Sequence, residues 1–365
     1  MTMLPSTPVQ EVDPSIRTAC EDVYNQWHNG DLLFKQAIDQ LVVIANTAAH
    51  ADQFANQGFA ENTIGMMYGY RADLDESIRH FARARDLFER ANNREMIVRA
   101  IMNLGESYRL KGDFPRARQF FSTAYRQATE FQFPQTQAFA AANEGHLLMA
   151  MNQFDPARER FDQAVAHAAD ITDESVRIDV LADANQGLAA YYLKQGQKGD
   201  AWRCALESLH LSRKSGQPYT MGLAYRTMGD VVTVLGYTPS GMPRFQRMQT
   251  PPENTDPTDM AYIGAATNEH LGDADLYFQL SIEALQEIKA EGEIARTIYA
   301  QGLSLMARGQ RVTASRKFQQ AMLMFIKLGM RDDANKAAQA QMNARQEPNG
   351  RGHLAPFQAD FVLQP

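Results

Sequence analysis

Small and large apolar residues recur along the chain with a helical spacing, and the same group returns at a regular interval. A small residue is followed by a large apolar residue four positions later and by a second small residue seven positions later, as at Ala117, Phe121 and Ala124. This spacing marks one face of a helix. Equivalent groups begin at Ala37, Ser77, Ala117, Ala157, Ala201, Ala274 and Ala314. The pattern therefore predicts a series of repeated helical units.

A second group, upstream of the first, predicts another helix in each unit. Gly65, Gly105 and Gly145 recur at the same interval, and each is followed by an apolar residue at the third position. Glycine inside a helix costs about 1 kcal/mol relative to alanine, so its recurrence indicates a close approach of two helices. Glycine or asparagine after such a helix fits the left-handed residue that ends it. The expected ends lie near Gly112, Asn152, Gly196, Gly236 and Gly309.

The two-helix unit resembles the tetratricopeptide repeat. The matching signature positions are Leu104, Gly105, Tyr108, Gly112, Phe114, Ala117, Phe121 and Ala124. The resemblance covers roughly residues 16–330 and implies an all-α fold, a right-handed superhelical solenoid of about seven stacked antiparallel helix pairs. The period is longer than the one usual in that family, so we expect helices that are longer by about one turn.

The prolines are consistent with this division of the chain. None of the 15 falls inside a predicted helix core, where it would cost about 3 kcal/mol. Five lie within 237–260, which we interpret as a loop inserted between the two helices of the sixth unit. We expect a solenoid over 16–346, with 331–346 as a C-terminal capping helix, and flexible tails at 1–15 and 347–365.

Composition and charge narrow the possible partners. The net charge is −7, from 36 basic and 43 acidic residues, and no block of five or six like charges is present. This balance argues against nucleic acid or an anionic membrane as a partner. Two cysteines suit a reducing compartment, and the segment 1–15 lacks the features of a secretory signal. We therefore expect a cytoplasmic protein.

The sequence offers little for catalysis. Its eight histidines form no HExxH motif, and no GxxxxGK[ST] or GxSxG motif is present. We therefore predict no enzymatic activity, no cofactor and no metal site.

In the tetratricopeptide repeat family, the first helix of each unit lines a concave groove. Transferring the family's groove positions, counted from the signature glycine, gives candidate residues for binding a peptide or protein. They are Asn62, Met66, Tyr70, Arg99, Asn103, Arg109, Phe139, Asn143, His146 and Arg226.

Asn103 and Asn143 are equivalent residues, each two positions before its glycine. An amide both donates and accepts, so it can hold the backbone of an extended peptide in either direction. The alternative is that asparagine merely tolerates an exposed helical site or makes a local hydrogen bond. Asn62 lies one position away from the equivalent place, and Asn185 is less well aligned.

The transferred groove has a formal charge of +2. Its charged residues are Arg99, Arg109, Lys194, Arg226 and Arg296 against Glu106, Asp183 and Asp230. A mildly positive groove on an acidic protein favours an acidic or carboxylate-ended peptide.

Three functions remain open. The first is a non-catalytic interaction module, a scaffold or adaptor that binds a peptide or protein segment in the groove. The alternative is a peptide-responsive regulatory sensor like the bacterial regulators that carry similar repeats. The third is an enzyme with an unfamiliar site near the inserted loop. The oligomeric state is not indicated by the sequence.

Overall fold

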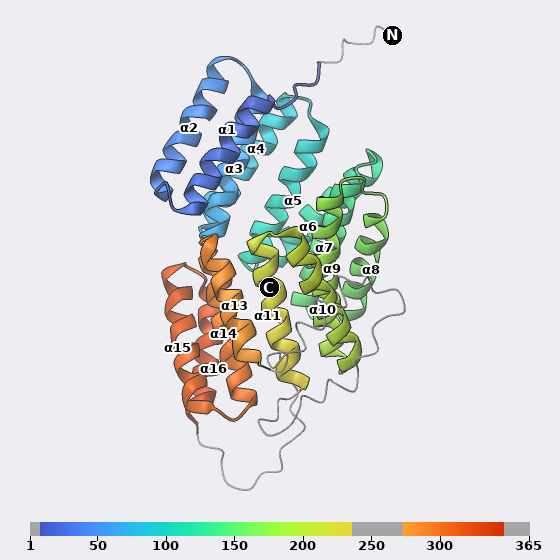
Figure 1. The fold of residues 1–365 in the computed structure, drawn as a ribbon. Coiled ribbons are helices and arrows are strands. Elements are labelled where there is room, and N and C mark those ends of the chain that lie inside the picture. The colour runs from blue at the N-terminus through green and yellow to red at the C-terminus, as the bar shows by residue number, and fades with distance from the viewer. Residues whose placement is uncertain (1–7, 236–272, 347–365) are drawn as a thin grey trace.

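The computed structural model describes residues 8–235 and 273–346, and all regular structure in these two ranges is α-helical (Figure 1). Fifteen helices follow one another in these ranges, and each packs against its neighbours along the chain. This confirms the predicted all-α solenoid. The predicted insertion at 237–260 and the predicted tail at 347–365 lie outside the described residues.

The repeat period consists of two helices and two short connections. Five consecutive helices have 17 residues each and are joined by connections of equal length, so two of them fill one period. They are α3 (Phe54–Tyr70), α4 (Leu74–Arg90), α5 (Arg94–Leu110), α6 (Phe114–Glu130) and α7 (Pro134–Ala150). Each is about 25 Å long at about 1.5 Å per residue.

The other helices complete seven pairs and one terminal helix in the described part of the chain. They are α1 (Pro14–Asn29), α2 (Phe34–His50), α8 (Phe154–Ala168), α9 (Glu174–Lys194), α10 (Lys198–Ser215), α11 (Pro218–Leu235), α13 (Ala274–Glu287), α14 (Glu291–Ala307), α15 (Arg311–Lys327) and α16 (Arg331–Arg345). Helices α11 and α13 form the sixth pair, and α16 covers the end of the seventh.

A left-handed residue lies in the connection after most helices. Gly112, Asn152, Gly196 and Gly309 have φ between 58° and 84°, so these predicted helix ends are confirmed. Gly236 lies outside the described residues. Ala72 adopts the same conformation, with φ of 59°, although a side chain is unfavourable there.

The recurring glycines lie where two helices of one unit come closest. A Cβ atom added to Gly65, Gly105 or Gly145 would lie 2.8, 2.7 or 2.6 Å from the phenylalanine ring of the next helix. The rings belong to Phe81, Phe121 and Phe161. In the fifth unit the two positions are Ala189 and Ala205, both fully buried. The sequence prediction of close helix approach is therefore confirmed.

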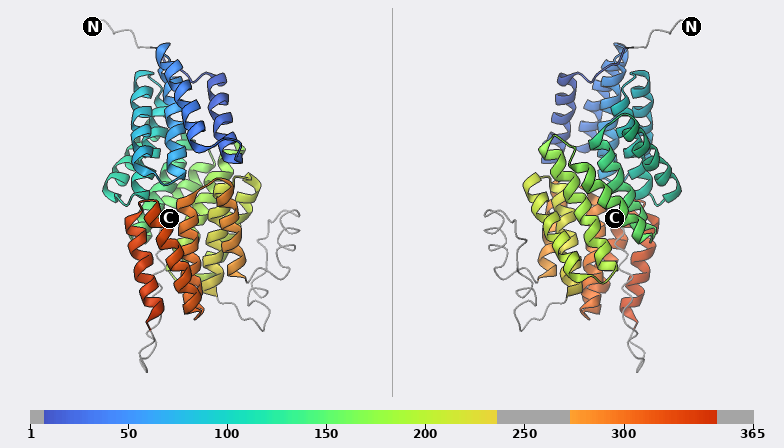
Figure 2. Two further views of the ribbon diagram at one scale, coloured as in Figure 1. Left: turned by 90° about the vertical axis from the view of Figure 1, so that its left-hand side faces the viewer. Right: turned by 90° about the vertical axis from the view of Figure 1, so that its right-hand side faces the viewer.

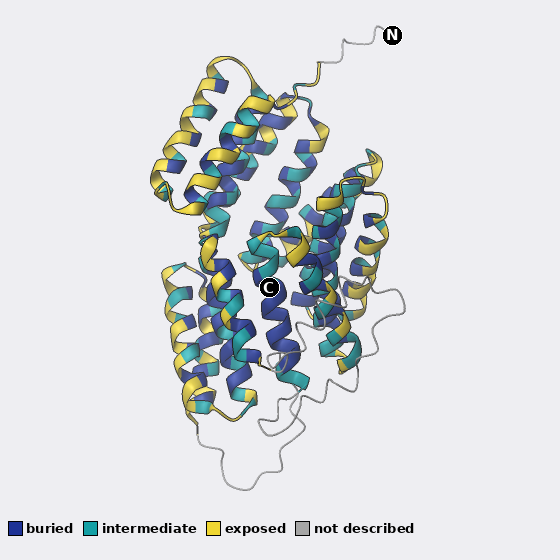
Figure 3. Cartoon of the chain, in the orientation of Figure 1, coloured by how far each residue is buried: buried dark blue, intermediate teal, exposed yellow. Residues whose placement is uncertain are grey.

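The first helices of the units face inward. Contacts between them run from α5 to α7, α9, α11, α14 and α16, and an inner helix such as α11 is far more buried than an outer helix such as α2 (Figure 3). The stack curves until α13–α16 lie beneath α1–α4 (Figures 1 and 2). The inner helices therefore surround a central space.

The packed part of the chain begins closer to the N-terminus than predicted. Within the expected tail 1–15, Val12 is buried, and the backbone N–H of Gln10 donates to the carbonyl of Ala91 at 2.8 Å. The side-chain carbonyl of Gln10 accepts from the N–H of Phe54 at 2.8 Å, which satisfies a free donor at the start of α3. This segment therefore extends the solenoid's packing, and α1 begins at Pro14.

We predict that Gly105→Ala lowers the free energy of unfolding by roughly 1–3 kcal/mol, because its methyl group would overlap the Phe121 ring. In a Phe121→Ala background the same change should stabilise the protein by up to about 1 kcal/mol, the helix preference of alanine over glycine. Chemical denaturation of the four proteins of this double-mutant cycle measures the coupling. Equal effects of Gly105→Ala in both backgrounds would show that the ring contact is not the cause.

Candidate functional site

The inner helices enclose a cavity of about 360 Å³, which we call the central chamber. Side chains from α3, α5, α7, α9, α11 and α14 contribute to its lining. A second cavity of about 530 Å³, the entrance cavity, lies among α1, α3, α5 and α7. Met66, Asn103 and Phe139 line both, so the two cavities adjoin each other. Cavities of this size are in the range of small-ligand and peptide sites.

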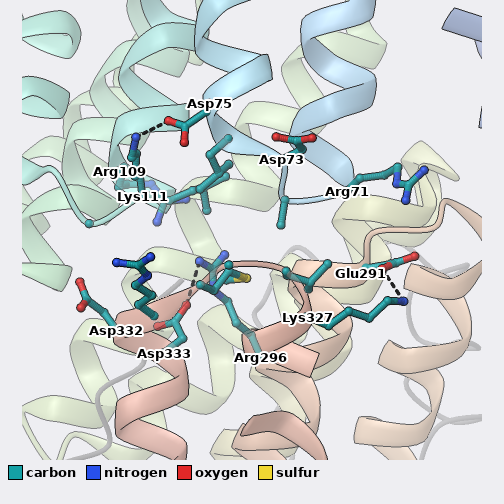
Figure 4. A pocket seen from close by; sticks show the side chains of 18 of the residues that line it. Arg71, Asp73, Asp75, Arg109, Lys111, Glu291, Arg296, Lys327, Asp332 and Asp333 are labelled. Atoms are coloured by element: carbon teal, nitrogen blue, oxygen red, sulfur yellow. Dashed lines mark hydrogen bonds and ion pairs between the residues drawn. The ribbon is translucent and has the colours of Figure 1, made fainter. Parts of the chain in front are cut away.

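A third cavity of about 1230 Å³, the seam cavity, separates the N-terminal units from the C-terminal units (Figure 4). Residues 71–75 and 109–112 line one side, and residues 327–333 line part of the other. Ala72 and Arg296 line both the seam cavity and the central chamber. The seam cavity therefore adjoins the chamber.

Seven of the ten predicted binding residues line the central chamber or the entrance cavity. They are Asn62, Met66, Tyr70, Arg99, Asn103, Phe139 and Asn143. Arg109 instead lines the seam cavity. His146 and Arg226 line none of the three cavities. Their roles in binding stay predictions.

The asparagines lie on neighbouring inner helices. The Asn103 Nδ2 donates to Asn62 Oδ1 at 3.0 Å, so Asn62 joins the group despite its offset in sequence. Asn143 lines the chamber, and its amide makes no hydrogen bond within the described part of the chain. Asn185 donates to the carbonyl of Leu181 at 2.8 Å, so it matches the alternative of a local hydrogen bond.

The predicted positive charge of the groove is wrong. The chamber and entrance cavity are lined by five carboxylates and two arginines, a formal charge of −3. The carboxylates are Glu21, Glu106, Asp179, Asp183 and Glu293, and the arginines are Arg99 and Arg296. Three predicted cations, Arg109, Lys194 and Arg226, do not line these two cavities.

The buried arginines are held in ion pairs, which explains the difference. The Arg109 guanidinium donates to both oxygens of Glu106, at 2.7 and 2.5 Å. Arg226 and Arg296 donate to the two oxygens of Glu293, at 2.6 and 2.5 Å. Burial alone would raise the pKa of Glu293, but the two guanidiniums lower it to about 2. These cations are thus neutralised within the protein.

Asp179 and Asp183 lie one turn apart on α9, and both line the chamber. Asp179 accepts a hydrogen bond from the Ser215 hydroxyl at 2.5 Å, and His146 Nε2 lies 3.0 Å from Asp183 Oδ1. Burial raises the pKa of Asp179 against the effect of this hydrogen bond, and the nearby carboxylates, Asp183 among them, raise it further. A ligand cation would relieve this repulsion.

The sequence prediction missed a ring of positions one turn beyond the transferred groove. Asp179, Tyr219 and Gly292 each lie ten positions before the signature small residue of their unit, and all three line the chamber. The family rule reached only six positions before it. Because these helices are longer by about a turn, their inner faces extend further, and the long repeat period was the available signal.

The described residues contain no group of three or more histidine, cysteine or carboxylate side chains placed to hold a metal ion. Cys20 and Cys204 are buried, and burial raises the pKa of their thiols to about 12 and about 11. None of the described helices is long and apolar enough to cross a bilayer.

These features define a helical repeat scaffold, the class of protein that presents an inner surface for interaction with other proteins. The family model of the tetratricopeptide repeat matches residues 57–130, which span most of α3 through α6, and the other helix pairs continue the same architecture. Residues 57–130 are thus tetratricopeptide repeats by sequence, and the rest of the described chain shares their architecture.

Two solved structures resemble the chain at low identity. A Rap protein complexed with competence and sporulation factor is 11% identical, with a TM-score of 0.50 over 92% of this chain and 88% of that chain. BtubC (BKLC) from P. vanneervenii is 16% identical, with a TM-score of 0.39 over 79% of this chain and 96% of that chain. The structural similarity to the Rap protein supports the assignment of the fold. No curated protein sequence matches the chain.

Asp230, a predicted groove residue, is buried on α11. It is 1% exposed, and neither carboxylate oxygen has a hydrogen-bond partner among the described residues. Burial raises its pKa from 3.8 to about 7, against the opposing effect of Arg226 and Lys194. In the folded protein the carboxyl group therefore stays protonated at pH values where it ionises in the unfolded chain.

We predict that this carboxyl makes the free energy of unfolding fall as the pH rises from about 4 to about 7, because only the unfolded state releases the proton there. Asp230→Asn should remove this dependence and stabilise the protein at pH 8 by roughly 1–3 kcal/mol, because the neutral amide avoids the cost of burying a charge. Urea unfolding at pH 4.5 and pH 8 provides the measurement. The prediction would be contradicted if the parent and Asp230→Asn differed in free energy of unfolding by the same amount at both pH values.

Proposed function

We propose that this protein is a non-catalytic scaffold that binds an extended peptide or protein segment in the central chamber, and that the segment carries a positively charged group. The observation that carries this proposal is the convergence of amides, aromatic rings and carboxylates in one chamber that adjoins an entrance cavity. The tetratricopeptide repeat family supports the general role as an interaction scaffold.

The asparagines supply contacts suited to a peptide backbone. Asn143 lines the chamber, and the Asn62–Asn103 pair lies at the junction of chamber and entrance. An extended segment that runs from the entrance into the chamber meets them in turn. Each amide can donate to a peptide carbonyl and accept from a peptide N–H.

The carboxylates favour a cation on the segment. Asp179 and Asp183 line the chamber together with Tyr70, Tyr219 and Phe139. A lysine, arginine or amino-terminal ammonium group gains both from the carboxylates and from the faces of aromatic rings. This replaces the acidic partner expected from sequence.

A second candidate function is a regulatory sensor that responds to a peptide. The observation that favours it is the contact between the two ends of the solenoid, since an occupant of the chamber touches helices from both ends. Small-angle scattering tests this candidate: a bound peptide should change the radius of gyration, and an unchanged radius on saturation would count against it.

We predict that Asp179→Asn with Asp183→Asn weakens binding of lysine-containing short peptides about tenfold, which corresponds to a loss of about 1.4 kcal/mol. Fluorescence polarisation with a labelled peptide library, in which each lysine-containing peptide has glutamine and glutamate counterparts, gives the affinities. The two substitutions should weaken the binding of the glutamine and glutamate counterparts far less. Asp162→Asn, an exposed carboxylate of α8 paired with Arg158, is the matched control.

The double variant Asn103→Ala, Asn143→Ala should weaken the binding of charged and neutral peptides alike, because it removes contacts to the peptide backbone. Helicity by circular dichroism should be unchanged. If both double variants bind the library as the parent does, the assignment of the chamber as the binding site is wrong.

A further inference from the structure

The two ends of the solenoid meet beside the seam cavity through a small number of side chains. Lys289, between α13 and α14, donates a hydrogen bond from Nζ to the carbonyl oxygen of Trp27 at 2.7 Å. Its Nζ also lies 5.6 Å from the centroid of the Trp27 ring. Trp27 is in the last turn of α1, where a cation interacts favourably with the helix dipole. Lys289 thus joins the sixth unit to the first.

An apolar patch adds to the contact, and it includes Tyr70 of α3, whose ring centroid lies 5.8 Å from that of Tyr219 of α11. Ala72, just after α3, belongs to a buried cluster with Ile288, Ala290 and Met330 of the C-terminal units. A Cβ atom added to Gly292 would lie 3.2 Å from the Ala72 Cβ, so the two backbones are nearly in contact here. Ala72 and Gly292 themselves bury few apolar atoms, so most of the apolar stabilisation here comes from Tyr70, Ile288 and Met330.

Three ion pairs at the seam each join residues of one side. Figure 4 shows Lys111 with Asp75 on the upper side, and Arg296 with Asp333 and Lys327 with Glu291 on the lower side.

The buried cations nearest the seam are also paired with a carboxylate on their own helix. Arg109 is neutralised by Glu106 on α5, and Arg296 by Glu293 on α14. Burial and the charge of Arg296 lower the pKa of Arg109, but the ion pair and hydrogen bond with Glu106 outweigh them and raise it overall, so the Arg109 charge is held by its own helix. Separating the two sides leaves each of these cations paired with its carboxylate, so no buried ion pair is broken, which would otherwise be costly.

We propose that the seam is a gate. The ends of α3 and α5 separate from α14 and α16 and close again, and Lys289 is the latch that holds the closed form. Because the seam cavity and the central chamber share Ala72 and Arg296 in their walls, opening the seam gives a segment a wider way into the chamber than the entrance cavity, and this is the main route of association. The gate concerns access to the chamber and does not depend on which segment binds there.

Thiol labelling of the full chain without any partner tests the gate. In an Ala72→Cys variant the introduced thiol is covered when the seam is closed and reacts with iodoacetamide when it opens. The native Cys204, which is 6% exposed and lies in the core of α10, reports global unfolding in the same sample. The introduced thiol should react at least tenfold faster than Cys204.

Adding Lys289→Ala should raise the labelling rate of the introduced thiol about five- to tenfold and leave that of Cys204 unchanged. Lys327→Ala is the matched control, because its ion pair with Glu291 stays on one side of the seam, and it should change neither rate. Equal rates of the two thiols in the Ala72→Cys chain, or an equal acceleration of both by Lys289→Ala, would overturn the gate in favour of global unfolding.

A disulfide between Ala72→Cys and Gly292→Cys provides the second test, because their Cβ atoms lie close to the separation that a disulfide requires. With a lysine-containing peptide that binds the reduced form, oxidation should slow association at least tenfold, and dithiothreitol should restore the rate. An unchanged association rate would overturn the gate. The absence of any binding peptide for the reduced chain would instead count against the proposed function, while the labelling test of the gate would stand.

Discussion

The contact between a glycine of the first helix and a phenylalanine ring of the second helix is the constraint on which the rest of the structure depends. It brings the two helices of a unit close together at the same height in successive repeats. Where the helices and connections are also of equal length, as in α3–α7, the units stack with a constant step. The inner helices therefore follow a regular curve, and the curve closes around a chamber. The fifth unit, where two alanines replace the pair, meets the same need with two small side chains.

Much of the fold could be predicted from the sequence because its causes are local. The small–large–small spacing, the glycine of close approach and the left-handed residue at Gly112 or Asn152 each depend on a few neighbouring residues. The longer period also predicts longer inner helices, and the groove positions taken from the family did not include the inward positions that this adds. A helix with one more turn adds one more inward position, and Asp179 and Tyr219 occupy it.

The charge of the site and the contact of the ends could not be predicted in the same way. Whether an arginine presents its charge to a cavity depends on its ion-pair partner, and the partner of Arg226 is Glu293, 67 residues away. The contact of Lys289 with Trp27 joins residues 262 positions apart. Such contacts depend on the accumulated curvature of all the intervening units, which no short sequence pattern records.

The left-handed Ala72 has a consequence for the energy of the closed form. An alanine in this conformation carries roughly 1–2 kcal/mol of backbone strain that a glycine would avoid. Its methyl group is also what fills the space in front of Gly292, so the glycine stands on one side of the contact and the strained alanine on the other. Closure offsets the strain through packing, whereas an open solenoid keeps the strain and loses the packing. A single methyl group therefore biases the molecule toward one relative placement of its two ends.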